Sequence, residues 1–140
     1  MSAYEHDLYA WTQTQGAALR RRAANEIDWD NLAEEIETSG RSDRREIRSR
    51  LEVLLIHLLK WRFQPELRCG SRQASIEEAR HRIAILIADS PSLAGYPAEC
   101  LPAAYPYARA RALRETGALN LPDACPWTAA LVLDDGWAPD

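Results

Sequence analysis

Apolar side chains recur every three or four residues along most of the chain, the spacing at which they share one face of an α-helix. Tyr4, Leu8 and Trp11 begin this pattern, which predicts a first helix over residues 3 to about 22. Ser2 and Glu5 have the spacing of a capping box, in which two side chains satisfy the free backbone N–H groups at a helix start. No stretch alternates between apolar and polar residues as a strand would. The predicted fold class is therefore all-α.

The stretch from residue 28 to residue 63 predicts two helices joined by a turn. Asp28 is suited to cap the first helix, over about 29–39, and Gly40 is suited to end it in the left-handed conformation. The second helix, about 42–63, is apolar nearly all round from Val53 to Leu59, which is typical of a helix surrounded by others. We therefore predict a central helical hairpin (about 29–39 and 42–63) that carries most of the core. The apolar stripe of its first helix consists of Trp29, Leu32, Ala33 and Ile36.

Three more helical segments follow the predicted hairpin, over about 72–88, about 97–116 and a short stretch ending near residue 133. Pro97, Pro102 and Pro106 fall in the second of these segments. A proline inside a helix loses a hydrogen bond and clashes with the preceding turn, which costs about 3 kcal/mol. The segment is therefore predicted to be kinked, or to become regular only near Pro102 or Pro106. Together these segments predict a single-domain bundle of about five to six helices over residues 1–140.

Composition supports a soluble globular protein, with 27% charged and 46% hydrophobic residues among 140. No apolar run approaches the roughly 20 residues of a membrane-spanning helix, and the start of the chain lacks the pattern of a signal peptide. The three cysteines are far apart and odd in number, which favours reduced thiols over a disulfide framework. These features predict a cytoplasmic protein that does not enter the membrane.

The charge is unevenly distributed along the chain. Residues 41–82 carry a net charge of +5 and the rest a net charge of −9. A basic segment can mark a nucleic-acid surface, but here acidic residues are interleaved with the arginines and no nucleic-acid-binding motif is present. The sequence therefore disfavours nucleic acid as a partner. Within the hairpin, structural ion pairs are predicted that link Glu34 and Glu37 with Arg41, Arg44 and Arg48.

A candidate pocket is predicted at the open end of the hairpin. His57 lies about 15 residues from the turn, or roughly 22 Å along a helix, which brings it level with Asp28 rather than with Glu37. The favoured interpretation is a buried histidine that hydrogen-bonds Asp28 or Asp30 and locks the hairpin. The alternative is a pocket that binds a ligand or moves a proton. Its candidate residues are Asp28, Trp29, His57, Lys60 and Trp61.

No metal site, cofactor or catalytic residue is predicted from these patterns. The separation of Glu37 from His57 argues against a shared metal ion in the hairpin. Cys125 precedes Pro126 at a predicted helix start, where a thiolate would be stabilised, but no histidine is near it in sequence. Cys125 is therefore interpreted as a packing residue.

Short motifs along nearly the whole chain point to a known family. They include Asp28-Trp29 followed by 31–37, then His57-Leu58-Leu59-Lys60-Trp61, and finally Cys125-Pro126-Trp127. In this combination the chain resembles the uncharacterised bacterial helical proteins catalogued as domain of unknown function 29. The resemblance implies a single helical domain, found largely in cyanobacteria and proteobacteria, and it implies no activity.

The functional prediction is accordingly a non-catalytic module that binds an unidentified protein partner or itself. Enzymatic activity stays undecided from the sequence, because no catalytic motif is present. The alternative function is a ligand-binding or metal-binding protein, or an enzyme, that uses the pocket around His57 and Asp28.

Overall fold

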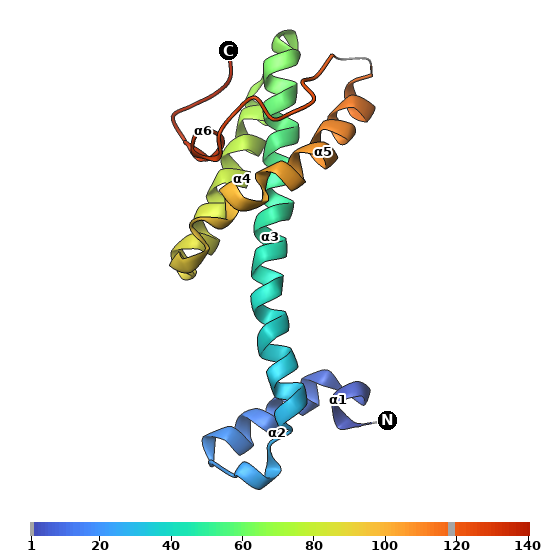
Figure 1. The fold of residues 1–140 in the computed structure, drawn as a ribbon, viewed down its shortest axis with the longest axis vertical. Coiled ribbons are helices and arrows are strands. Elements are labelled where there is room, and N and C mark those ends of the chain that lie inside the picture. The colour runs from blue at the N-terminus through green and yellow to red at the C-terminus, as the bar shows by residue number, and fades with distance from the viewer. Residues whose placement is uncertain (1, 118–119) are drawn as a thin grey trace. The chain divides into compact units, whose positions relative to one another are not determined.

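A computed structural model describes residues 2–117 and 120–140 and confirms the all-α fold class. The described residues form six α-helices and no strand (Figure 1). The helices are α1 (Ala3–His6), α2 (Leu8–Arg20), α3 (Trp29–Phe63), α4 (Gly70–Asp89), α5 (Tyr96–Thr116) and α6 (Ala129–Leu133), with short 3₁₀ turns at η1 (Ala24–Glu26), η2 (Pro65–Leu67) and η3 (Pro91–Leu93). Across the described ranges, none of these helices has the length and hydropathy to cross a membrane.

The chain folds into two compact units, unit 1 (Met1–Ser42) and unit 2 (Asp43–Asp140). In unit 1, the first predicted helix is divided at Asp7. Ser2 and Glu5 form the predicted capping box at the start of α1. Asp7 then leaves the helical conformation, with φ −149°, and its carboxylate accepts a hydrogen bond from the Ala10 backbone N–H at 3.0 Å. The single helix over residues 3–22 was therefore wrong, because an aspartate stabilises a new helix start better than a helix interior.

Hydrogen bonds from α2 fix the start of α3 within unit 1. The buried Gln15 amide donates to the Glu26 carbonyl oxygen at 3.1 Å and accepts from the Asp28 backbone N–H at 2.7 Å. The Trp11 indole N–H donates to the Asp28 carboxylate at 3.0 Å. Directional contacts of this kind fix geometry as well as adding stability. The buried residues of unit 1 are Trp11, Gln15, Ala18 and Ile27.

The predicted hairpin is wrong, because α3 continues as one helix from Trp29 to Phe63. Gly40 does not end a helix: of the described glycines, only Gly117 has a positive φ. Arg41 pairs with Glu34 at 3.3 Å and with Glu37 at 3.9 Å, and it donates a hydrogen bond to the Thr38 hydroxyl at 2.9 Å. These contacts span the turn that contains Gly40 and offset its low helix propensity.

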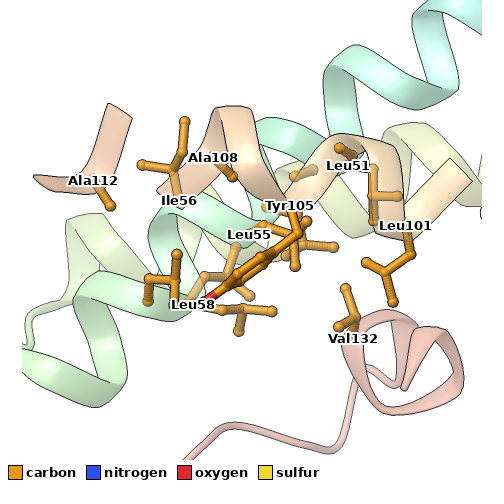
Figure 2. Packing of buried hydrophobic residues seen from close by; sticks show 14 of the residues in the cluster. Leu51, Leu55, Ile56, Leu58, Leu101, Tyr105, Ala108, Ala112 and Val132 are labelled. Carbon is orange, nitrogen blue, oxygen red and sulfur yellow. The ribbon is translucent and has the colours of Figure 1, made fainter. Parts of the chain in front are cut away.

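The core of unit 2 forms around the C-terminal part of α3, where the sequence placed it. All seven buried residues of α3 lie between Ile47 and Leu59, and none lies before Ile47. α4 and α5 pack against this segment, and Val132 of α6 joins the same core (Figures 1 and 2). Tyr105 of α5 is buried in that cluster, and its hydroxyl donates to the Pro122 carbonyl oxygen at 2.7 Å. The apolar run of α3 is therefore covered on several sides.

Helix α5 tolerates its two interior prolines, Pro102 and Pro106, because they face away from the core, while the buried Pro97 lies in the first turn, where its missing N–H costs nothing. The helix begins at Tyr96, so of the two predicted alternatives the one in which it becomes regular only near Pro102 or Pro106 was wrong. Both prolines are exposed, whereas Leu101, Ala104, Tyr105 and Ala108 are buried. Each proline removes the hydrogen bond to the carbonyl four residues earlier, and water can solvate that carbonyl on the exposed face. The predicted end at Thr116 is confirmed, with Gly117 at φ 89°.

Replacing Gly40 with Ala is expected to raise the free energy of unfolding by about 0.5–1 kcal/mol, because Ala has the higher helix propensity. No atom of the structure lies within 4 Å of a Cβ added at Gly40. Urea denaturation followed by far-UV circular dichroism measures the effect. The control is Gly117→Ala, which is expected to destabilise the protein because φ is positive there. A loss of stability in Gly40→Ala would contradict a continuous α3.

Candidate functional site

The residues of the predicted pocket fall in different units. Asp28 and Trp29 belong to unit 1, whereas His57, Lys60 and Trp61 belong to unit 2. The predicted hydrogen bond between His57 and Asp28 or Asp30 depended on a chain reversal at Gly40, which α3 does not make. In the described part of the chain, that hydrogen bond is not formed.

Asp28 serves a structural purpose at the beginning of α3. Its carboxylate accepts hydrogen bonds from the Asn31 amide at 2.9 Å and the Trp11 indole at 3.0 Å. These two hydrogen bonds lower the pKa of Asp28, the one from Asn31 most. On the same side of the helix, the Tyr4 hydroxyl donates to the Glu35 carboxylate, which raises the pKa of Tyr4 to about 12. These hydrogen bonds thus join α1 and α2 to the beginning of α3.

His57 lies half-buried in unit 2 beside a small cavity. The cavity has a volume of about 100 Å³, and His57 shares it with Arg50, Val53, Ser75, Glu78 and Ala79. The Nδ1 atom of His57 is buried and has no hydrogen-bond partner. Burial lowers the pKa of the imidazole, as do the positive charges of Lys60 and Arg72, while Glu115 opposes them. The neutral imidazole is therefore the form that this site favours.

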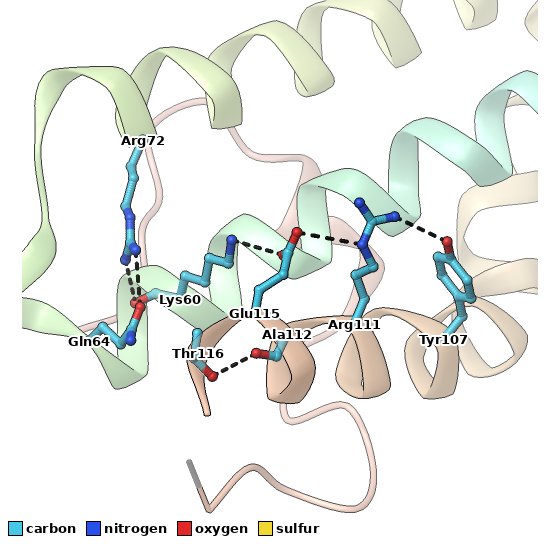
Figure 3. A network of polar contacts seen from close by, with 8 residues as sticks. All are labelled: Lys60, Gln64, Arg72, Tyr107, Arg111, Ala112, Glu115 and Thr116. Atoms are coloured by element: carbon cyan, nitrogen blue, oxygen red, sulfur yellow. Dashed lines mark hydrogen bonds and ion pairs between the residues drawn. The ribbon is translucent and has the colours of Figure 1, made fainter. Parts of the chain in front are cut away.

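Lys60 links α3 to α5 through a polar network (Figure 3). Its ammonium group lies 2.9 Å from the Glu115 carboxylate, which also pairs with Arg111 at 3.5 Å. The hydrogen bond from Lys60 is the main cause of the lowered pKa of Glu115. Arg111 continues the network to the Tyr107 hydroxyl at 3.3 Å. Both charges of Lys60 and Glu115 have partners, so this cluster holds two helices together.

Trp61 is partly buried, and the guanidinium group of Arg68 lies 5.2 Å from the centre of its ring. Arg68 also donates to the Trp61 carbonyl oxygen at 2.7 Å. These contacts fix the end of α3 against η2.

The predicted ion pairs are distributed differently along α3. Glu34 and Glu37 both pair with Arg41. Arg44 instead pairs with Glu99 at 3.7 Å and lies 4.6 Å from the ring centre of Tyr96, so it contacts α5. Arg48 pairs with Glu52 at 3.2 Å, within its own helix. Arg44 and Arg48 are therefore used inside unit 2.

The Cys125 thiol is not activated in the structure. Burial raises its pKa, and the thiol donates weakly to the Trp127 carbonyl oxygen at 3.4 Å. The short helix α6 begins only at Ala129, where Thr128 caps it, so Pro126 does not open a helix. Within the described ranges, no group of three or more His, Cys, Asp or Glu side chains has a geometry suited to a metal ion.

The strongest candidate site is the apolar stripe at the beginning of α3, which sequence reasoning assigned to the core. Trp29 is 61% exposed and Ile36 is 67% exposed, while Leu32 between them is partly buried. On a helical wheel these side chains lie within about 60° of Trp29, on a different face from Asp28, Asn31 and Glu35. We call this the α3 surface (Trp29, Leu32, Ala33 and Ile36).

Acidic side chains border the α3 surface on one flank. Asp30 and Glu37 lie at about 100° and 80° from Trp29 on the wheel, and both are exposed. All four charged residues from Trp29 to Glu37 are acidic. The arrangement is that of an apolar helix surface with negative charge beside it, which suits binding to an apolar helix that carries positive charge.

A comparison with protein families identifies one match. The family model with the description "Domain of unknown function DUF29" matches residues 3–138, which is nearly the whole chain. Searches of curated proteins and of solved structures found no match. The family match agrees with the resemblance seen in the sequence motifs.

The pH dependence of stability tests the environment of His57. Because its pKa lies below the ordinary value of 6.5, the unfolded chain takes up this proton before the folded chain does. The free energy of unfolding should therefore fall as the pH drops below 6.5, until the folded-state pKa is passed. Urea denaturation between about pH 7.5 and about pH 5 should show a smaller fall for His57→Leu than for wild type.

The control for this measurement is His81→Leu, on the exposed face of α4. The free energy of unfolding of His81→Leu should change with pH as that of the wild type does. Equal profiles for wild type and His57→Leu would show that burial does not disfavour the charged imidazole.

Proposed function

We propose that this chain, which belongs to the DUF29 family of domains of unknown function, is a protein-interaction module. The proposal is based on the side chains exposed on its surface. Unit 1 binds a basic amphipathic helix of a protein partner on the α3 surface. The observation that carries the proposal is that Trp29 and Ile36 are exposed on a helix segment with no buried residue before Ile47.

Unit 1 has a small apolar core, and this favours binding of a partner that covers its exposed side chains. Only four of its described residues are buried, and one of these is Gln15. Units of about 40 residues bury too little apolar surface to be very stable, and they usually depend on staples or partners. Burying one exposed Ile or Trp side chain contributes about 1.5–3 kcal/mol, so a partner that covers Trp29 and Ile36 adds materially to stability.

Charge defines the chemistry of the partner. Residues 1–42 contain eight acidic and four basic side chains, whereas residues 43–140 contain thirteen of each. The net charge of −4 therefore comes from unit 1 alone. A helix with an apolar stripe and a flank of lysine or arginine satisfies both the α3 surface and its acidic border.

Binding can be measured with a defined peptide. A fluorescent 18-residue amphipathic helix made of Leu and Lys is titrated with the full chain, and fluorescence anisotropy reports binding. The variant Trp29→Ser/Ile36→Ser is expected to bind at least about tenfold more weakly, because it loses two exposed apolar side chains of the kind that dominate interfaces. The same peptide with Glu in place of Lys is expected not to bind.

The matched control is Ile85→Ser, which removes an exposed apolar side chain from α4 in unit 2. It should bind the basic peptide as wild type does. Equal binding by wild type and the double variant, or equal binding of the acidic peptide, would rule out this surface.

A further inference from the structure

Unit 1 carries a second exposed apolar surface, on α2. Leu8, Tyr9 and Leu19 are all exposed, with Tyr9 at 75%. On a helical wheel Leu8 and Leu19 lie about 20° apart, and Tyr9 lies about 100° from Leu8. We call this the α2 surface (Leu8, Tyr9 and Leu19). Together with Trp29 and Ile36, unit 1 holds five of the ten large hydrophobic residues exposed in the described chain, although it is much the smaller unit.

The C-terminal end of the α2 surface has the opposite charge from the acidic border of the α3 surface. Arg20 is the only charged residue of α2, and Arg21 and Arg22 follow directly. Arg21 pairs with Glu26 at 2.9 Å. Arg20 and Arg22 are exposed, and neither makes an ion pair with another described residue. The end of α2 therefore presents apolar side chains beside free positive charge.

We propose that the basic amphipathic helix bound by the α3 surface is α2 of a second copy of this chain. The inference rests on the proposed function and names its partner. In the dimer, Leu8, Tyr9 and Leu19 of each copy cover Trp29 and Ile36 of the other. Arg20 and Arg22 then face the acidic border of the α3 surface at Asp30 across the interface.

Reciprocal pairing follows from the position of both surfaces on the same unit. In a dimer with two-fold symmetry, a contact from α2 of one copy to α3 of the other occurs twice, and the assembly closes. Charge disfavours the α3–α3 alternative, which would bring acids together. The α2–α3 contact instead joins apolar side chains with opposite charge.

The types of residue involved suit a stable contact. Tryptophan, tyrosine and arginine are the residues that contribute most to binding energy at protein interfaces, and the two surfaces contain all three. All five apolar side chains are already exposed on unit 1, so the dimer needs no rearrangement of unit 1 to cover them.

Two charge-reversed variants of the full chain test the pairing. Asp30→Lys reverses the charge at the border of the α3 surface and leaves the Glu37–Arg41 pair intact, and Arg20→Glu/Arg22→Glu makes the end of the α2 surface acidic. Each variant alone then has like charges at both contacts. An equimolar mixture restores opposite charges at both contacts of a heterodimer. Sedimentation velocity measures the mass from about 1 to about 500 µM at low salt, and far-UV circular dichroism checks that each variant is folded.

The expected result is a wild-type dimer, at least about tenfold weaker dimerisation of each variant alone, and recovery of a 1:1 dimer in the mixture. Dimerisation of wild type should also weaken as salt is added. A wild type that stays monomeric over the whole range overturns the inference. So does a dimer that survives Arg20→Glu/Arg22→Glu, which would point to an α3–α3 contact, or a mixture that fails to recover.

The peptide-binding and dimerisation experiments test the proposed function and the inferred dimer separately. If the Leu–Lys peptide binds the α3 surface while the chain stays monomeric, the interaction module stands and only the identity of its partner is wrong. If the chain dimerises as expected, the same peptide should compete with the dimer, because both occupy Trp29 and Ile36. Loss of both peptide binding and dimerisation would overturn the two proposals together.

Discussion

The architecture depends on α3 remaining helical through Gly40. Glycine is a poor helix former, and the sequence around it has no apolar side chain to bury. The three contacts of Arg41, with Glu34, Glu37 and Thr38, hold this turn from both sides. Each such exposed contact contributes only a few tenths of a kcal/mol, yet together they offset a glycine penalty of about 1 kcal/mol. A weak local balance therefore decides whether α3 continues through Gly40.

Features set by neighbouring residues could be predicted from the sequence. The capping box of Ser2 and Glu5 needs only two side chains three residues apart, and the helical spacing of apolar residues from Ile47 to Leu59 by itself indicates a helix face that packs in the core. Whether Gly40 ends a helix or lies inside one could not be predicted in the same way, because the two kinds of glycine look alike in sequence. The choice between them depends on competing contacts within a fraction of a kcal/mol.

The prediction at His57 failed because it depended on the prediction at Gly40. Without a reversal, the carboxylates of Asp28 and Asp30 are not partners of the imidazole. The residues that do act on His57, among them Lys60, Arg72 and Glu115, come from α3 and from helices far along the chain. Sequence spacing within α3 could place Lys60 one turn away, but it carried no information about Arg72 or Glu115. The same limit applied to α5, where only packing shows that Pro102 and Pro106 face outward.

Unit 1 uses polar contacts where a small unit would ordinarily use apolar ones. Gln15, Trp11 and Tyr4 bind α3 through hydrogen bonds to Asp28 and Glu35. These bonds fix the position of α1 and α2 without covering Trp29 or Ile36, which lie on another face of the helix. Since α2 likewise turns Leu8 and Leu19 outward, the unit leaves two apolar surfaces exposed. Apolar burial supplies little specificity by itself, whereas the negative border of one surface and the arginines of the other select which two can meet. Charge thus explains why two exposed surfaces on one unit suit each other in two copies.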